Sequence, residues 1–72
     1  MKLLLKERAL DECLAELGIS RDELARRMGV STATTYRAHT ERTEPGPKFI
    51  AALMDVTGKP FEDLFEITKD VA

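Results

Sequence analysis

The sequence contains one cysteine, Cys13, and no tryptophan among its 72 residues. A single thiol cannot form an internal disulfide or assemble a cysteine-based metal site, so neither kind of scaffold is expected. Glycine and proline are scarce, with four and three residues, which argues against a disordered chain. No uninterrupted apolar run approaches the length of a membrane span or of a signal peptide's apolar region. These absences predict a folded cytoplasmic protein without a membrane partner.

The residues that are present have the composition of one small folded domain over residues 1–72. Hydrophobic residues make up 43% of the chain and charged residues 33%. The net charge of −2 argues against a nucleic-acid partner, because domains that bind nucleic acid usually carry net positive charge. However, residues 21–48 carry six basic and four acidic side chains, whereas residues 49–72 carry two and five. The central segment can therefore face phosphates while the acidic end lies elsewhere.

Apolar residues in the first part of the chain recur at helical spacing. They are Leu3, Leu10, Leu14 and Leu17, and Gly18 follows where a left-handed C-terminal cap belongs. The spacing predicts a first helix that includes Leu3 and ends near Leu17.

A second helix is predicted to begin at Ser20, because Ser20–Glu23 matches a capping box. Gly29 can adopt positive φ in the turn that follows. Ser31 or Thr32 can then cap a third helix that ends near His39.

The remainder of the chain predicts two more helices after a polar loop. Pro47 suits the first turn of a fourth helix that ends at Gly58, and Pro60 can open a short fifth one. Phe61 and Phe65 are expected to point inward from this last helix. The expected fold class is all-α, with five helices and no strand.

The second and third predicted helices are joined by a specific series of residue types. A polar residue starts the helix, an apolar residue precedes a small one, and two apolar residues flank a glycine. The series is Arg21, Leu24, Ala25, Met28, Gly29 and Val30. With it and the closing Phe61–Phe65, the chain resembles the lambda and 434 repressor and Cro-like (XRE-type) helix-turn-helix DNA-binding family over about residues 3 to 66. The resemblance implies a compact five-helix domain with its motif at about residues 20–39, whose helix Ser31–His39 enters the major groove of DNA.

Three positions depart from the family pattern. Thr35 and Ala38 stand where the family usually has larger apolar side chains on the inner face of the third helix. Glu41 stands where the family often has glycine. The third helix is therefore expected to pack more loosely or to lie closer to its neighbour.

The resemblance assigns two sets of DNA-contacting residues. The base-reading candidates share one face of the third helix: Thr32, Ala33, Tyr36 and Arg37. Arg37 is the main candidate, because a guanidinium group can make a bidentate contact with guanine. The phosphate-binding candidates are Arg21, Thr34, Thr40, Arg42, Thr43 and Lys48.

Other noticeable residues have simpler explanations. Arg26 and Arg27 are read as a solvated helix face rather than as a source of long-range attraction. Cys13 and His39 lack an accompanying orienting carboxylate or oxyanion loop, so no enzyme activity is expected. His39 has no second ligand in sequence, and no metal, cofactor or small-molecule ligand is expected.

The C-terminal part supplies more apolar surface than so small a domain is expected to bury. The residues concerned are Phe61, Phe65, Ile67 and Val71, the last two in the tail 67–72. They predict a homodimer interface, formed either in solution or only on DNA. Dimers of the resembled family place their recognition helices about 34 Å apart, one turn of the duplex.

Two functions remain open at this point. The first is a Cro- or repressor-like transcriptional regulator that binds operator DNA in the nucleoid of a bacterial host, such as a phage lytic–lysogenic switch protein. The second is a protein-interaction module on the same fold, similar to an antitoxin or adaptor. The acidic balance and the threonine-rich third helix favour the second, whereas arginines at the motif positions favour the first.

Overall fold

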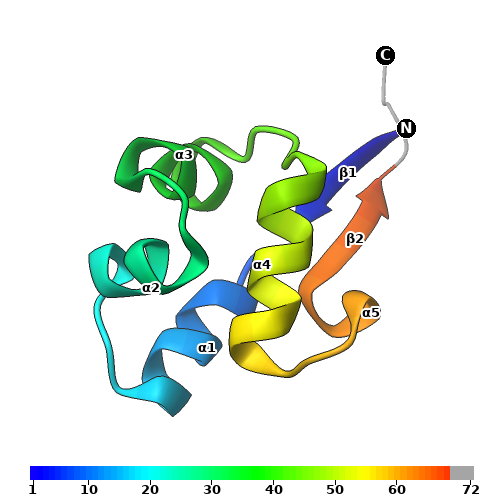
Figure 1. The fold of residues 1–72 in the computed structure, drawn as a ribbon. Coiled ribbons are helices and arrows are strands. Elements are labelled where there is room, and N and C mark those ends of the chain that lie inside the picture. The colour runs from blue at the N-terminus through cyan, green and yellow to red at the C-terminus, as the bar shows by residue number, and fades with distance from the viewer. Residues whose placement is uncertain (69–72) are drawn as a thin grey trace.

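The computed structural model describes residues 1–68 and is mainly helical, with a small sheet at one side (Figure 1). The predicted fold class with five helices is confirmed. A π-helical segment, η1, continues the third helix. In chain order the elements are β1 (Lys2–Leu5), α1 (Ala9–Leu17), α2 (Arg21–Met28), α3 (Thr32–Tyr36), η1 (Arg37–Glu41), α4 (Pro47–Thr57), α5 (Phe61–Leu64) and β2 (Phe65–Thr68).

The sheet is the main difference from the sequence-based expectation. β1 and β2 pair antiparallel, with Leu3 opposite Ile67 and Leu5 opposite Phe65. Leu3 therefore belongs to a strand, and its placement on the first helix was wrong. The helix begins only at Ala9, because a turn intervenes in which the Lys6 N–H donates to the Leu64 carbonyl at 2.8 Å. The strand depends on a partner at the other end of the chain, which helical periodicity cannot reveal.

β2 includes the first two residues of the predicted tail, Ile67 and Thr68. The Thr68 hydroxyl donates to the Lys2 carbonyl at 3.5 Å. Val71, one of the predicted interface residues, lies outside the described residues.

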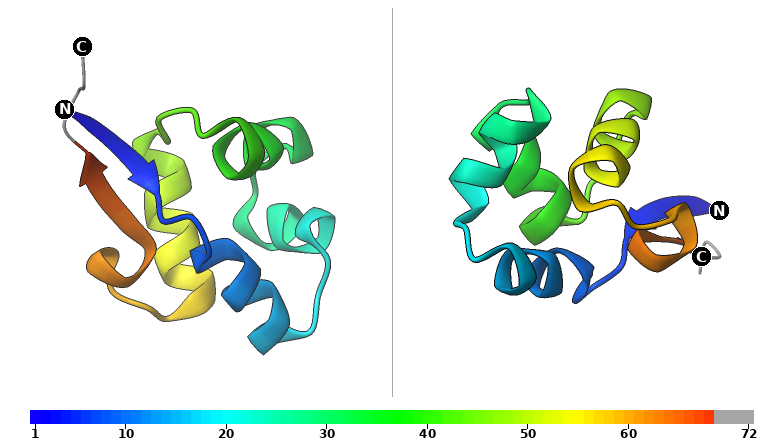
Figure 2. Two further views of the ribbon diagram at one scale, coloured as in Figure 1. Left: turned by 180° about the vertical axis from the view of Figure 1, so that it is seen from behind. Right: turned by 60° about the horizontal axis from the view of Figure 1, so that its bottom comes forward.

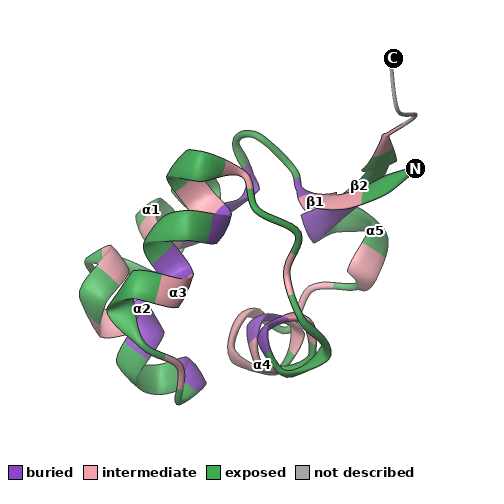
Figure 3. Cartoon of the chain, turned by 90° about the horizontal axis from the view of Figure 1, so that it is seen from above, coloured by how far each residue is buried: buried purple, intermediate pink, exposed green. Residues whose placement is uncertain are grey.

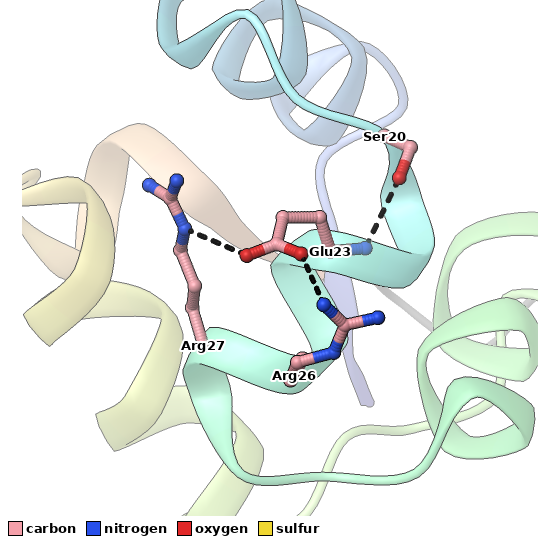
Figure 4. A network of polar contacts seen from close by, with 4 residues as sticks. All are labelled: Ser20, Glu23, Arg26 and Arg27. Atoms are coloured by element: carbon pink, nitrogen blue, oxygen red, sulfur yellow. Dashed lines mark hydrogen bonds and ion pairs between the residues drawn. The ribbon is translucent and has the colours of Figure 1, made fainter.

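The start of α2 follows half of the predicted capping box (Figure 4). The Ser20 hydroxyl accepts a hydrogen bond from the Glu23 N–H at 3.1 Å, which satisfies one of the free donors of the first turn. The Glu23 carboxylate, in contrast, accepts from Arg26 at 2.7 Å and from Arg27 at 3.3 Å. The Ser20 side chain thus caps the helix, whereas the Glu23 side chain pairs with the two arginines in the following turn of α2.

The turn between α2 and α3 is built on Gly29, as predicted. Its φ of 72° is left-handed, a conformation that costs glycine little because it has no Cβ. The Gly29 N–H donates to the Arg26 carbonyl and the Val30 N–H to the Ala25 carbonyl, both at 3.1 Å, which closes the end of α2. Ser31 then caps α3 by accepting from the Thr34 N–H at 3.0 Å. Short-range hydrogen bonds therefore fix the angle at which α3 leaves α2.

The core draws side chains from the sheet and from the helices around α4. Leu10, Leu24, Leu53 and Leu64 are completely buried, and Phe49 and Phe65 are almost so. Burial of each such side chain contributes about 1.5 to 3 kcal/mol. In Figures 1 and 2, α4 lies between the α2–α3 pair on one side and the sheet on the other. This arrangement leaves α3 on the outside of the molecule.

Ala25→Leu is expected to lower the free energy of unfolding by about 1 to 3 kcal/mol, because Ala25 has no exposed surface and a larger side chain overpacks the interior. Thermal denaturation measures the effect. Ala51→Leu, at an exposed position of α4, is the control and should change stability little. Equal melting temperatures for the two variants would contradict the close packing of α2.

Candidate nucleic-acid interface

The predicted helix Ser31–His39 is present but ends differently from the expectation. α3 continues as η1 to Glu41, two residues further than predicted, and Arg42 then adopts a left-handed φ of 56°. The Arg42 N–H donates to the Arg37 carbonyl, and the Thr43 N–H reaches the same oxygen at 3.2 Å. This conformation costs a non-glycine residue about 1 to 2 kcal/mol, so the surroundings must hold it in place.

Two contacts to the sheet hold this exit from the helix. An Arg42 guanidinium nitrogen donates to the Glu66 carboxylate on β2 at 3.2 Å. The Leu3 N–H on β1 donates to the Glu44 carboxylate at 3.3 Å. The sheet, which sequence reasoning missed, therefore anchors the loop that follows η1.

The inner and outer faces of α3 and η1 are clearly separated. Thr35 is completely buried and Ala38 is 3% exposed, and the Thr35 hydroxyl donates to the Ser31 carbonyl at 3.1 Å. The base-reading candidates are all exposed: Thr32, Ala33, Tyr36 and Arg37. In Figure 3 the α3 ribbon accordingly carries both buried and exposed residues. The predicted facing of the helix is confirmed, while base reading itself stays a prediction.

All four base-reading candidates line one open pocket between the start of α2 and the outer face of α3. The other lining residues are Arg21, Asp22 and Glu41. The pocket thus combines the base-reading candidates with the first phosphate-binding candidate. Asp22 and Glu41 were not among the predicted site residues. Glu41 stood out only as a departure from the family pattern, and nothing in the local pattern distinguishes Asp22 from other surface carboxylates.

Arg21 is held at the edge of this pocket by three neighbours. Its guanidinium carbon lies 4.9 Å from the centroid of the Tyr36 ring, a cation–π arrangement. Its Nη1 group donates to the Thr40 hydroxyl at 3.3 Å and to Nδ1 of His39 at 3.1 Å. The start of α2 is thereby tied to both α3 and η1.

The other phosphate-binding candidates do not line the pocket. Thr34 accepts from the Ser31 hydroxyl at 2.8 Å, and Arg42 is paired with Glu66. Thr43 and Lys48 are exposed, the latter in the first turn of α4. Of the phosphate-binding candidates, Arg21 therefore lines the pocket and Thr40 contacts Arg21. The other four lie outside the pocket: Thr34, Arg42, Thr43 and Lys48.

Arg26 and Arg27 behave as a solvated helix face. Their side chains are 76% and 48% exposed, and both contact the Glu23 carboxylate (Figure 4). This carboxylate offsets part of their positive charge.

Cys13 and His39 do not have the features of a nucleophile pair. Cys13 is 1% exposed, and burial raises the pKa of its thiol, which stays protonated at neutral pH. Both ring nitrogens of His39 are engaged elsewhere, Nδ1 by Arg21 and Nε2 by Asp11 at 3.0 Å. Within residues 1–68 no group of three or more potential metal ligands comes together, and no helix is long and apolar enough to cross a membrane.

Lys59 forms an ion pair outside the pocket. Its ammonium group contacts the Glu16 carboxylate at 2.7 Å, and this hydrogen bond raises the pKa of Lys59. The pair ties the turn after α4 to α1, so its role is structural.

The predicted interface residues differ in accessibility. Phe65 is 2% exposed and packs inside the domain, with the half-buried Phe61 stacked on it at 5.2 Å between ring centroids. Ile67 is 64% exposed on β2. The apolar surface available to a partner is therefore centred on Ile67.

Comparison with known families adds a decisive observation to this geometry. The model of the Cro/C1-type HTH DNA-binding domain matches residues 9–70. The chain belongs to the Cro/C1-type helix-turn-helix DNA-binding family. Comparison with curated proteins and with solved structures gave no match. In this Cro/C1-type domain α2 is the first helix of the motif and α3 with η1 is the second, and the pocket lies between these two helices.

Proposed function

We propose that this Cro/C1-type domain is a sequence-specific transcriptional regulator that reads operator DNA through the major groove. The observation that carries the proposal is the shared pocket, in which the exposed side chains of α3 and η1 lie beside Arg21. Arg37 makes a bidentate contact with guanine, and the methyl groups of Thr32 and Ala33 pack on thymine. Tyr36 contacts a base edge or the adjoining sugar-phosphate.

Phosphate binding is assigned first to Arg21. It is the first residue of α2, where free backbone N–H groups and the helix dipole favour an anion. The Thr40 hydroxyl accepts from Arg21 and donates its own proton to the same phosphate. Thr34, Arg42, Thr43 and Lys48 extend these contacts along the backbone of the DNA, once Arg42 exchanges Glu66 for a phosphate.

The regulator acts as a Cro- or repressor-like protein, such as a phage lytic–lysogenic switch protein. Its activity would then be set by its concentration and by competition for operators. A nucleoid location in the bacterial cytoplasm follows from this role.

A protein-interaction module is the second candidate. The observation that favours it is the presence of two carboxylates, Asp22 and Glu41, among the pocket residues, which would repel phosphates and attract a basic partner surface.

Salt-dependent binding to the DNA upstream of its own gene separates these two functions. The regulator should lose affinity as salt rises, with a log–log slope of about −0.9 for each phosphate contact. A footprint at 50 and 200 mM salt, with a scrambled duplex as control, measures both slope and specificity. A flat salt response without a footprint would favour the interaction module.

Arg37→Ala should weaken binding by about 1 to 3 kcal/mol per half-site and relax specificity at one base pair, because a bidentate base contact is lost. Arg37 is exposed, so the fold should be unaffected. Arg26→Ala is the matched control, since it removes an arginine that does not line the pocket. Equal weakening on every sequence would identify Arg37 as a phosphate contact instead.

We further propose that the protein binds its operator as a homodimer whose interface includes Ile67 and the half-buried Phe61. The sheet lies across α4 from α3 in Figure 1, so a partner at Ile67 leaves the recognition helix exposed. Phe65 supports this surface from inside, stacked on Phe61.

Ile67→Asp should weaken dimerisation at least tenfold without unfolding the domain, because it places a charge at an exposed position of the proposed interface. Sedimentation with and without operator DNA measures the assembly. Ala51→Asp adds the same charge at an exposed site on α4 and should leave the dimer intact. An unchanged dimer in Ile67→Asp would place the interface elsewhere.

A further inference from the structure

We propose that His39 is a positioning residue for Arg21. The neutral His39 ring, which is oriented by Asp11, holds the Arg21 guanidinium over Tyr36, and protonation of the ring releases the guanidinium. The inference deepens the DNA-binding function proposed above, because it makes the phosphate contact of Arg21 sensitive to pH. It begins from one chain of contacts that joins α1, η1, α2 and α3.

The hydrogen-bond partners determine which ring nitrogen of His39 carries the proton. Arginine has no acceptor, so Nδ1 must accept the hydrogen bond from Nη1 of Arg21 at 3.1 Å. The proton of the neutral ring is therefore on Nε2, which donates to the Asp11 carboxylate at 3.0 Å. The His39 side chain is 18% exposed, whereas the Asp11 side chain is 63% exposed, so the contact with Arg21 is the better shielded of the two.

Proton uptake changes one of these contacts and keeps the other. In the charged ring both nitrogens are donors, so an Nδ1–H would face the N–H groups of Arg21. That hydrogen bond is lost, and two positive charges repel each other across the same gap. The contact with Asp11 becomes an ion pair, which keeps the ring in place. Arg21 then retains the Thr40 hydroxyl at 3.3 Å as its hydrogen-bond partner.

The neutral arrangement prepares Arg21 for a phosphate. Thr40 and His39 engage Nη1, and within residues 1–68 Nε and Nη2 of Arg21 donate no hydrogen bond, although the guanidinium lies over the Tyr36 ring. These groups present three donors in a planar fork, the geometry that suits a phosphate. Part of the rotamer entropy of the Arg21 side chain is already lost when the guanidinium is held before DNA arrives, so less is lost on binding.

Other charged groups near the ring do not replace this contact. Asp11 of α1 and Arg21 of α2 are the charged side chains with a hydrogen bond to the His39 ring. The ionisable residues of η1 and α3 in the pocket are Arg37, Glu41 and Tyr36, and Asp22 lies there on α2. β1, which also packs against η1, carries exposed Lys2 at its start.

The first test uses the free protein and needs no DNA. NMR follows the Nε–Hε signal of Arg21 and the ring signals of Tyr36 and His39 from pH 8 to pH 5, the range in which histidine changes charge. The Arg21 and Tyr36 signals should move with the same midpoint as the His39 ring. In His39→Asn these movements should disappear, because the amide oxygen accepts from Arg21 at every pH. Arg21 signals that ignore the titration of His39 would overturn the proposal.

The second test measures affinity for the footprinted DNA at constant salt. The wild-type protein should bind about fivefold more weakly at pH 5.5 than at pH 7.5, the equivalent of about one hydrogen bond. The affinity of His39→Asn should not depend on pH, and at pH 7.5 it should exceed that of His39→Ala. Tighter binding of the wild type at low pH would show that the added charge acts only by general attraction, and the proposal would fail.

The two tests also separate this inference from the function on which it rests. A protein that binds no DNA at any pH would contradict the proposed regulator. The NMR titration would still decide whether His39 holds Arg21.

Discussion

The close packing of α2 against α3 is the constraint on which the rest of the structure depends. Three of the buried side chains in the motif are small, which lets its two helices lie close together. They are Ala25 on α2, Thr35 on α3 and Ala38 on η1. Gly29 permits the tight turn between the two helices. Because the helices lie so close, the first residue of α2 can reach across to Tyr36. The pocket between the start of α2 and the outer face of α3 is a direct result of this approach.

The electrostatic potential at the pocket depends on the charged side chains around it rather than on the net charge of the chain. Screening limits the interaction of exposed charges to about 8 Å at physiological salt, so acidic residues on remote elements matter little at the pocket. Within the pocket two arginines lie among two carboxylates. The surface of the pocket is therefore weakly charged, and the orientation of each arginine matters more than it would on a strongly basic face.

The features that sequence predicted correctly are those decided by nearby residues. These features depend on neighbours within about one helical turn. They are the helix caps at Ser20 and Ser31, the left-handed φ of Gly29 and the inward direction of Thr35 and Ala38. The β1–β2 pairing and the contact of Arg21 with His39 join residues far apart in the chain. The spacing of apolar residues along the sequence does not indicate which distant residues come into contact. The helix exit at Arg42 was missed for the same reason, since its unfavourable φ is supported by Glu66 on a strand that was not expected.

The pairing of β1 with β2 also bears on the order in which the chain folds. Lys2 and Thr68 are 66 positions apart, so their contact closes almost the whole described chain into a loop. Closing so long a loop costs entropy before it gains contacts, whereas helices that follow one another in sequence dock over short distances. The helix-turn-helix is thus expected to assemble before the sheet, and on unfolding the sheet is expected to open first. The loop after η1 would lose its anchors at Glu44 and Glu66 in the same event.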